Sequence, residues 1–580
     1  MNGLAESSLP SWRPRLIFAV LGAGFCAIFY QSWQTQVEQS AFLRAQGQQR
    51  YQRQLPLPAP ARGEIFDRYG QPLALSVPSS TLWVDPKVFA QQQARWPELA
   101  RVLGMSSAEI GKRLQHSGSA FAYLLRQVDP QLAARALALG IPGLHELQEY
   151  RRFYPSGQIT GPLLGFTNIE GVGSEGLELA YDNILRSRAG QREVLRDNHG
   201  HLLSSAPENV SHPGQPLTLT IDRRLQYAAY TALAAAVQRF AAHTGSAVLL
   251  DAHSGAILAM ANYPASNPND REHYDPAGAT DRAITHTFEP GSVMKPFAVA
   301  AALDSGSIQA GSRFDVDTNC FRVASYCIQD DARHGTLDIA QILKYSSNIG
   351  AAKIALRTPA ADLYGLLSRA GFGRSVGLAL PGESAGRLPA YQQWGPAAHA
   401  AIAYGYGISV NTLQLAAAYA AIANGGVYVQ PHLLKGQQGE ERRVMAASTA
   451  AELRNWLAGV VASGGTGFLA AIPGYTVAGK TGTAAMANGK GGFHRHQVNT
   501  SFVGFAPAQN PRFVMAVTVR DPTQGWRYGG VVAAPVFRST MSVALRNAGI
   551  PPQAGSAQAI HPRSIAEQQR WAEGAGDVQH

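Results

Sequence analysis

The stretch FEPGSVMKPF, Phe288 to Phe297, places a serine and a lysine at a spacing that allows chemistry between them. Ser292 follows Pro-Gly, and Lys295 comes three residues later, which is one helical turn. At a helix start, unpaired backbone amides and the helix dipole stabilise negative charge on the hydroxyl. Apolar neighbours disfavour the ammonium form of the lysine, because burial lowers the pKa of an amine. A neutral amine can take the serine proton and turn the hydroxyl into a nucleophile.

A plainer interpretation of the same residues is an N-cap serine followed by a solvated lysine. Two counts favour the chemical interpretation. The chain has 8 lysines against 41 arginines, and Ser292/Lys295 is its only S-x-x-K match. Arginine serves this chain for ordinary positive charge and cannot lose its proton, whereas a buried lysine can. Each lysine is therefore informative.

Two further motifs follow. KYSSNIG contains an S-x-N, from Ser346 to Asn348, with Ser347 in the middle. VAGKTGTA contains Lys480 and Thr481, and it follows a strand-like YTVAG. Each motif alone is ordinary, since S-x-N is often a turn and K-T-G-T can be a hairpin. The order S-x-x-K, S-x-N, K-T-G predicts a serine acyl-transfer site.

The K-T-G-T segment is expected on an edge strand. A period of two puts Lys480 and Gly482 on one face, where Gly482 leaves room for a close neighbour and Lys480 offers a fixed positive charge. The hydroxyls of Thr481 and Thr483 can hold a substrate carboxylate. The backbone amide of Thr483 can pair with that of Ser292 as an oxyanion hole.

The chain resembles the monofunctional class B penicillin-binding proteins, and most closely the septal, division-type D,D-transpeptidases of Gram-negative bacteria. The resemblance rests on the three motifs and on long segments from the anchor to about residue 540. These are RGEIFDRYGQPLALSVP, RRFYPSGQITGPLLGFTN, GSEGLELAYD, FEPGSVMKPF, YGYGISVNTLQLAAAYAAIANGG and YGGVVAAPVF. It implies an α/β (α+β) serine penicillin-recognising transpeptidase fold, in which helices flank a five-stranded antiparallel sheet. An elongated N-terminal pedestal domain and a transmembrane anchor are expected before it.

The resemblance implies a role for each motif residue. Ser292 attacks the carbonyl between two D-alanines of a stem peptide, and Lys295 is the base for acylation. Ser346 relays a proton to the leaving amine, while Asn348 holds the substrate amide. Lys480 and the residues after it bind the terminal carboxylate; they are Thr481, Gly482 and Thr483.

The resemblance also implies the rest of the reaction. An amine from a neighbouring stem peptide resolves the acyl-enzyme and forms the cross-link, and β-lactams leave a long-lived acyl-Ser292. The expected aromatic walls of the site are Tyr404, Tyr406 and Tyr528, although core packing explains any one of them equally well. No cofactor and no metal are expected.

The N-terminus predicts a membrane anchor. Residues 16–37 carry no charge, Arg13 and Arg15 precede them, and no lysine or arginine follows until Arg44. This bias places residues 1–15 in the cytoplasm and the catalytic domain in the periplasm, as a single-pass protein of the bacterial inner membrane. A cleaved signal is disfavoured because no small-x-small site follows the apolar run, and Phe25 before Cys26 is too bulky for a lipoprotein site.

The amino-acid composition favours a globular protein and argues against nucleic-acid binding. The 580 residues are 46% hydrophobic and 15% charged, which is typical of a globular chain. The net charge of +10 is scattered, and no basic stripe with interleaved aromatics indicates nucleic-acid binding. A diffuse positive field fits a membrane surface or an anionic polymer better.

The predicted domains are a helical stalk over residues 38–54, a non-catalytic, dimerisation-like pedestal over 55–210, a transpeptidase domain over 215–548 and a flexible tail over 549–580. Within them the sequence predicts two short strands joined at Tyr69-Gly70 and helices between residues 91 and 140. A loop-rich region with a helix near 177–185 and a linker near 204–217 follow. A strand leading into an Ala-rich helix and a hairpin over 245–264 begin the transpeptidase domain.

Cys320 and Cys327 lie on the exported side of the anchor, so a disulfide between them is permitted. Spacing leaves a bridge and two free thiols as equal alternatives. No cysteine or histidine pair joins them into a zinc pattern. HELQEY begins like a metalloprotease motif but has Glu149 where the second histidine belongs.

Other functions that share the motifs fit less well. A class A β-lactamase has aspartate where this S-x-N has Ser347, and the chain lacks an E-x-x-L-N between the motifs. A bifunctional polymerase needs more residues before the catalytic domain, and a D,D-carboxypeptidase is smaller. An elongation-type or redundant paralogous transpeptidase and a catalytically silent division scaffold stay open. The segment AAMANGKGGFHRHQ after K-T-G departs from the family pattern, and this departure bears either on inhibitor preference or on acceptor positioning.

The expected partners are peptidoglycan stem peptides, β-lactam antibiotics, the membrane, a polytopic lipid-II glycosyltransferase and other division proteins.

Overall fold

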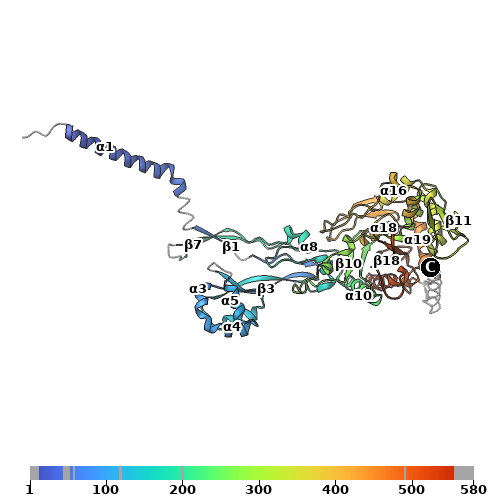
Figure 1. Ribbon diagram of the computed structural model, residues 1–580, viewed down its shortest axis with the longest axis horizontal. Helices are drawn as coiled ribbons and strands as arrows, with labels where there is room; N and C mark the ends of the chain where they lie inside the picture. The colour runs from blue at the N-terminus through green and yellow to red at the C-terminus, as the bar shows by residue number, and fades with distance from the viewer. Residues whose placement is uncertain are drawn as a thin grey trace, which may run out of the picture. The chain divides into compact units, whose positions relative to one another are not determined.

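The computed structural model of the chain describes residues 12–43, 52–56, 59–115, 121–196, 202–488 and 492–553. It forms two compact units, of which the first combines residues 1–61 with 187–213 and the second combines 62–186 with 214–580 (Figure 1). Most of the predicted tail, from residue 554 on, lies outside the described residues.

The first unit contains the apolar N-terminal helix and a small sheet. Helix α1 (Trp12–Trp33) continues into a π-helical turn, Gln34–Glu38, and this helix is long and apolar enough to cross a membrane. Strands β1 (Gln52–Pro56), β6 (Gln191–Arg196) and β7 (Leu202–Asn209) form an antiparallel sheet in the order β1-β6-β7. The predicted helical stalk over residues 38–54 is therefore wrong for residues 52–54, because β6 supplies partners for their backbone groups.

The second unit begins with a sheet that we call the N-terminal sheet. Its strand order is β4-β3-β2-β8, and β5 also pairs with β3. The strands are β2 (Ile65–Phe66), β3 (Pro72–Val84), β4 (Ala122–Val128), β5 (Leu144–Phe153) and β8 (Leu217–Thr218). The predicted turn at Tyr69-Gly70 is confirmed: Gly70 has a φ of +80°, and the Asp67 carboxylate accepts from the amides of Tyr69 and Gln71.

Short helices pack on this sheet. They are α3 (Pro86–Phe89), α4 (Trp96–Leu103), α5 (Ser107–Gln115), α6 (Pro130–Leu137), α7 (Gly161–Leu164), α8 (Gly176–Ala180) and α9 (Asp182–Leu185). The helical prediction for residues 91–140 holds for α4, α5 and α6 but is wrong at β4. The loop-rich region and the linker likewise contain β5, β6 and β7. β5 pairs with β3 and β6 pairs with β1, which are far away in sequence, so local pattern carries no signal of those pairings; β7 pairs with the neighbouring β6.

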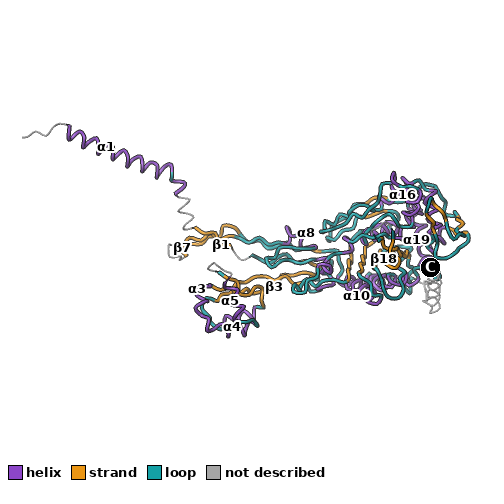
Figure 2. Tube along the Cα trace, viewed as in Figure 1, coloured by secondary structure: helices purple, strands orange, loops and turns teal. Residues whose placement is uncertain are grey.

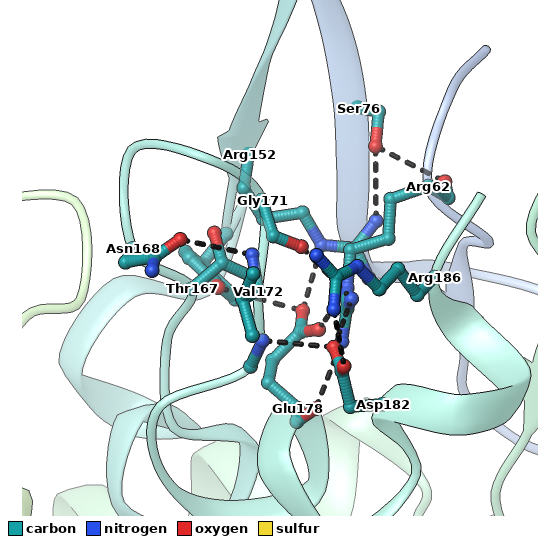
Figure 3. A network of polar contacts seen from close by, with 12 residues as sticks. Arg62, Ser76, Arg152, Thr167, Asn168, Gly171, Val172, Glu178, Asp182 and Arg186 are labelled. Atoms are coloured by element: carbon teal, nitrogen blue, oxygen red, sulfur yellow. Dashed lines mark hydrogen bonds and ion pairs between the residues drawn. The ribbon is translucent and has the colours of Figure 1, made fainter. Parts of the chain in front are cut away.

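Four charged side chains tie this part of the second unit together (Figure 3). Both oxygens of the fully buried Glu178 carboxylate accept from arginines, at 2.6 Å from Nε of Arg62 and 2.7 Å from Nε of Arg152. Arg62 also reaches Asp182 at 2.6 Å and donates to the carbonyl of Gly171 at 3.0 Å. We call Arg62, Arg152, Glu178 and Asp182 the arginine–glutamate network.

The predicted five-stranded antiparallel sheet is confirmed, in the order β10-β9-β19-β18-β17, and we call it the C-terminal sheet. Its strands are β9 (Thr244–Asp251), β10 (Ile257–Tyr263), β17 (Ala478–Ala487), β18 (Phe493–Ala506) and β19 (Phe513–Arg520). The predicted hairpin is β9–β10, and the K-T-G-T strand β17 lies at the sheet edge, as expected.

Helices cover both faces of this sheet (Figure 2), because its strands are apolar on both sides. Along β9, Ala247 and Leu249 join the core under α10 (Arg223–Arg239) and α21 (Ala534–Asn547). Val248 and Leu250 join the core that holds α18 (Thr412–Ala423). The predicted Ala-rich helix is α10, and the Asp222 carboxylate caps its start.

The other helices of this part of the chain surround the motifs. They are α11 (Pro276–Ala279), α12 (Arg282–Thr285), α13 (Lys295–Asp304), α14 (Ile339–Tyr345), α15 (Asn348–Arg357), α16 (Ala360–Arg369), α17 (Pro396–Ala403), α19 (Ala447–Val461) and α20 (Gly529–Val532). The short strands outside the two large sheets are β11 (Arg313–Asp315), β12 (Phe321–Val323), β13 (Tyr326–Ile328), β14 (Thr336–Asp338), β15 (Val427–Val429) and β16 (Glu441–Arg443).

Candidate active site

Ser292 lies in a 3-10 turn, Gly291–Met294, directly before α13. Two hydrogen bonds stabilise this turn. The amide of Gly291 donates to the carbonyl of Gly405 at 3.1 Å, and the hydroxyl of the fully buried Tyr419 donates to the carbonyl of Val293 at 2.7 Å. Ser292 itself is half-buried, and its hydroxyl makes no hydrogen bond with any described residue. A fixed turn with an unengaged hydroxyl suits a nucleophile.

Lys295 begins α13 and is fully buried. Its Nζ donates to the carbonyl oxygen of Ser346, to the Ser346 hydroxyl at 3.1 Å and to Oδ1 of Asn348 at 2.8 Å. The amine therefore points to the S-x-N segment, whereas the sequence placed it toward the Ser292 hydroxyl. Burial lowers the pKa of Lys295 to about 8, against the opposing charges of Asp330 and Asp331.

The backbone conformation of the S-x-N segment explains why its oxygen atoms point toward Nζ of Lys295. Ser346 ends α14 in the left-handed conformation, with a φ of +63°, which turns its carbonyl and hydroxyl toward the same neighbour. Ser347 then caps α15, because its hydroxyl oxygen accepts from the amide of Gly350 at 2.9 Å. Asn348 starts α15, and its amide nitrogen Nδ2 donates to the carbonyl of Gln329 at 3.0 Å.

Asp330 supports this segment, although it belongs to none of the sequence motifs. Its carboxylate accepts from the Ser347 hydroxyl at 2.5 Å, from the Asn348 amide at 2.5 Å and from the Ile349 amide at 2.9 Å. It sits at the N-terminus of α15, where the helix dipole favours a negative charge. Two adjacent aspartates at the end of a short strand were the available signal.

A hairpin delivers Asp330 to this position. Strands β12 and β13 pair antiparallel, and Asp330 follows β13 after one residue. The Cys320–Cys327 disulfide closes the hairpin, with the two Cα atoms 5.2 Å apart. The disulfide that the sequence left open thus lies in the segment that supports the S-x-N motif.

Lys480 lies in strand β17, and its side chain contacts Ser346 as Lys295 does. It is fully buried, and its Nζ lies 2.9 Å from the Ser346 hydroxyl, which Lys295 also contacts. Burial lowers the pKa of Lys480 well below its usual range, and the nearby charge of Lys295 lowers it further. The sequence assigned Lys480 a fixed positive charge. The structure instead places both lysine amines within hydrogen-bond distance of the Ser346 hydroxyl, so the charge of each one affects the pKa of the other.

Gly482 is where strand β17 packs against the Gly291–Met294 turn, which we call the nucleophile turn because it carries the candidate nucleophile Ser292. A Cβ at this position would lie 2.9 Å from the carbonyl oxygen of Pro290 and 2.3 Å from the Ser501 hydroxyl, so only glycine fits. On the other face of the strand, the Thr481 hydroxyl donates to that of Thr466 at 2.9 Å. The Thr483 hydroxyl accepts from the amide of Gly529 at 3.2 Å. Each threonine hydroxyl retains capacity for a further hydrogen bond.

The three predicted aromatic residues surround β17. The ring centroids of Tyr404 and Tyr406 are 5.8 Å apart, edge to face, and the Tyr406 hydroxyl accepts from the amide of Ala485 at 3.3 Å. Tyr528 caps α20 and directly precedes Gly529. Burial raises the pKa of all three hydroxyls. All three are half-buried, so both wall and packing roles remain compatible with their positions.

The geometry brings together the nucleophile turn, the S-x-N segment and the K-T-G-T strand around two buried amines. It defines a serine acyl-transfer site. Among the described residues, no group of three or more histidine, cysteine, aspartate or glutamate side chains could hold a metal ion.

Comparison with known proteins identifies the family. Residues 245–542 match the penicillin binding protein transpeptidase domain, and residues 58–219 match the penicillin-binding protein dimerisation domain. The chain belongs to the penicillin-binding protein transpeptidase family, and a dimerisation domain ahead of the transpeptidase domain makes it a class B member.

Two curated relatives match over most of their length. One is the probable peptidoglycan D,D-transpeptidase PbpC of Pseudomonas aeruginosa, 41% identical over 89% of this chain and 92% of the relative. Another is the peptidoglycan D,D-transpeptidase FtsI of Escherichia coli, 38% identical over 85% of each chain. Among solved structures, penicillin binding protein 3 of Mycobacterium tuberculosis in complex with aztreonam matches with a TM-score of 0.67 and 26% identity, over 87% of this chain and 99% of that one.

Proposed function

We propose that Ser292 is the acylating residue of this penicillin-binding protein and that the enzyme acts at the division septum. The activity itself is peptidoglycan D,D-transpeptidation, which the transpeptidase domain and relatives such as FtsI support. One observation carries the assignment of Ser292. A fully buried lysine one turn away makes its hydrogen bonds to the S-x-N segment and has its pKa lowered toward neutrality.

The first half-reaction uses the lysine pair. Neutral Lys295 takes the Ser292 proton as Oγ bonds to the carbonyl carbon between the two D-alanines. The oxyanion rests on the backbone amides of Ser292 and Thr483. The proton then reaches the leaving amine through Ser346, whose hydroxyl contacts both lysine amines, at 3.1 and 2.9 Å. The terminal D-alanine departs, and the acyl-enzyme remains.

Substrate binding determines which of the two lysines, Lys295 or Lys480, carries a proton. A terminal carboxylate held by Thr481 and Thr483 lies beside the strand that carries Lys480 and favours a proton on it. One proton on Lys480 disfavours a second on Lys295, because both amines contact the hydroxyl of Ser346. The carboxylate thereby leaves Lys295 neutral when the scissile bond arrives. Asn348, fixed by Gln329 and Lys295, holds the substrate amide.

The proposed function also includes a location in the inner membrane. Helix α1 is a single-pass anchor for the inner membrane, with the catalytic domain in the periplasm. The pedestal (residues 55–210) and the transpeptidase domain (215–548) follow, and the partners are a polytopic lipid-II glycosyltransferase and other division proteins. An elongation-type role would give round cells on depletion of the protein, whereas the septal role predicts filaments.

A fluorescent penicillin tests the assignment of Ser292. The full chain in detergent is expected to take up one label per molecule, and the Ser292→Ala variant none. Labelling that survives the substitution would move the nucleophile elsewhere. Absence of labelling in the natural chain would favour the silent scaffold.

A further inference from the structure

The hairpin of β12 and β13 joins a disulfide to the S-x-N segment. Cys320 directly precedes β12 and Cys327 lies in β13, so the bridge between them closes the open end of the hairpin. At the other end the chain turns at Ala324, which has a φ of +52°. Gln329 and Asp330 follow β13 directly. Asp330 is therefore only three residues away from the bridge.

Four hydrogen bonds connect the two residues after the hairpin to the S-x-N segment and the start of α15. The Asp330 carboxylate accepts from the Ser347 hydroxyl and from the next two backbone amides along the chain. The Gln329 carbonyl accepts from Nδ2 of Asn348 at 3.0 Å. Oδ1 of Asn348 in turn accepts from Nζ of Lys295 at 2.8 Å. The hairpin is thus linked to the proposed base through a single side chain.

Pairing alone holds the two strands weakly. They form a two-stranded sheet of three residue pairs, and a hairpin of this size is marginally stable in water. Val323 and Ile328 bury their side chains in the core, whereas Arg322 and Cys327, a cross-strand pair, are exposed. The disulfide adds a covalent link where the pairing is short.

The effect of the bridge is expected to be local. Its two cysteines are 7 positions apart in sequence, and a disulfide that closes so short a loop constrains the unfolded chain less than one that closes a long loop. The bridge therefore bears more on the position of the hairpin and of the residues that follow it than on the stability of the whole unit.

The bridge is also accessible to a thiol. Cys327 is exposed and Cys320 is half-buried. Exposed disulfides exchange with thiolates more readily than buried ones. The third cysteine of the chain, Cys26, lies in α1, which belongs to the other compact unit. A reductant that reaches the second unit thus acts on one disulfide.

We propose that the Cys320–Cys327 pair is a thiol–disulfide exchange site that controls the rate of acylation. In the oxidised form the bridge holds Asp330 against the S-x-N segment. Reduction releases the two strands from each other and weakens the four hydrogen bonds to this segment. The inference rests on the proposed acylation of Ser292. Asp330 and the two cysteines contact no reacting atom, so they are positioning residues.

The exchange partner is a dithiol, which reduces the bridge by two electrons. One thiolate of the dithiol attacks Sγ of Cys327, the S–S bond breaks, and Cys320 leaves as a thiolate. The second thiolate of the dithiol then attacks the mixed disulfide and releases Cys327. Both cysteine thiolates take up a proton, and the dithiol, which has lost two protons, ends as a disulfide.

Dithiothreitol tests the site on the full chain in detergent. The reduced protein is separated from the reagent under nitrogen, and mass spectrometry confirms the gain of two hydrogen atoms. The second-order rate of Ser292 labelling by fluorescent penicillin is expected to fall about fivefold, because the hydrogen bonds to the S-x-N segment weaken. The fall should be smaller than for Asp330→Asn, since Val323 and Ile328 still anchor the strands. Reoxidation with oxidised glutathione should restore the rate.

Three variants serve as controls. The double variant Cys320→Ser/Cys327→Ser lacks the bridge and is expected to label at the reduced rate, with no response to dithiothreitol. Cys26→Ser keeps the bridge and should match the natural chain in both states. In Asp330→Asn the response to dithiothreitol should disappear, because the bridge acts through this carboxylate and the two changes are therefore not additive.

Several outcomes would overturn the exchange site. A labelling rate that complete reduction leaves unchanged does so, as does a bridge that resists dithiothreitol in the folded protein. A fall that persists after reoxidation, or an equal fall in Asp330→Asn, limits the bridge to a structural role and also overturns the proposal. Failure of the proposed function gives a different result, since the oxidised natural chain would then take up no label at Ser292.

Discussion

Glu178 in helix α8 lies between two arginines, whereas Lys295 in the active site lies beside a second lysine. All of these side chains are buried. The arginine–glutamate network gives each buried charge an opposite partner within 2.7 Å (Figure 3). Among the described residues, the two lysines have only neutral oxygen acceptors within hydrogen-bond distance.

This difference distinguishes buried charges that stabilise the fold from buried amines that can lose a proton. Arginine holds its proton under all conditions, so a paired arginine can only bind and orient. An unpaired buried lysine reduces its desolvation cost by losing its proton, and that makes it a base. Pairing keeps the network charged, whereas the proposed role of Lys295 as a base depends on its having no charged hydrogen-bond partner among the described residues. Four predictions test this comparison.

The largest effect on the acylation rate is expected from replacing Lys295 with arginine, the residue that carries the positive charge in the arginine–glutamate network. Lys295→Arg keeps the positive charge but removes the ability to become neutral, so acylation should fall by about 10³-fold or more. The second-order rate of labelling by fluorescent penicillin measures it. Arg454→Lys, on the helix α19, serves as a substitution of similar size away from the site. A rate within tenfold of the natural chain would show that Lys295 need not deprotonate.

The converse change unpairs the network. Glu178→Gln leaves Arg62 and Arg152 buried without their carboxylate, which should lower the free energy of unfolding by about 3–5 kcal/mol. Denaturant unfolding of the full chain measures it. Glu170→Gln removes an exposed partner of Arg126 and should change stability by less than about 1 kcal/mol. Equal effects of the two substitutions would mean that the network is not a structural unit.

The pH dependence of acylation reports the lysine pair. Only neutral Lys295 can take the Ser292 proton, and burial lowers the pKa of Lys295 to about 8. The labelling rate should therefore rise with pH by about tenfold per pH unit below about pH 8 and level off above it. A rate that stays constant on both sides of about pH 8 would indicate that Lys295 is not the base.

A smaller effect is expected from the carboxylate behind the S-x-N segment. Asp330→Asn loses a charged acceptor for the Ser347 hydroxyl and the Asn348 amide, so acylation should slow about tenfold. Asp330→Glu should recover part of the rate, because it restores the charge. Asp317→Asn removes an exposed partner of Arg333 nearby and should have no effect on acylation. A loss of stability without a loss of rate would limit Asp330 to a structural role.

Local pattern predicted much of the fold and most of the cluster. The turn at Tyr69-Gly70, the helix α10 and the hairpin β9–β10 follow from spacing and turn chemistry within a few residues. The motif order named the side chains that converge on Ser346. Strands β4 and β5 were missed because their stability comes from pairing with β3, which lies outside any local window. The roles of the individual site residues remain predictions until the substitutions are made.

By itself, the sequence determined the apolar N-terminal helix, the edge strand with its K-T-G-T and the helical spacing of Ser292 and Lys295, because each depends only on neighbours along the chain. Only the tertiary structure decided that Lys480 shares Ser346 with Lys295 and that Asp330 fixes the S-x-N segment. Desolvation and charge proximity set these properties. Both depend on residues that are far apart in sequence and meet only when the chain folds.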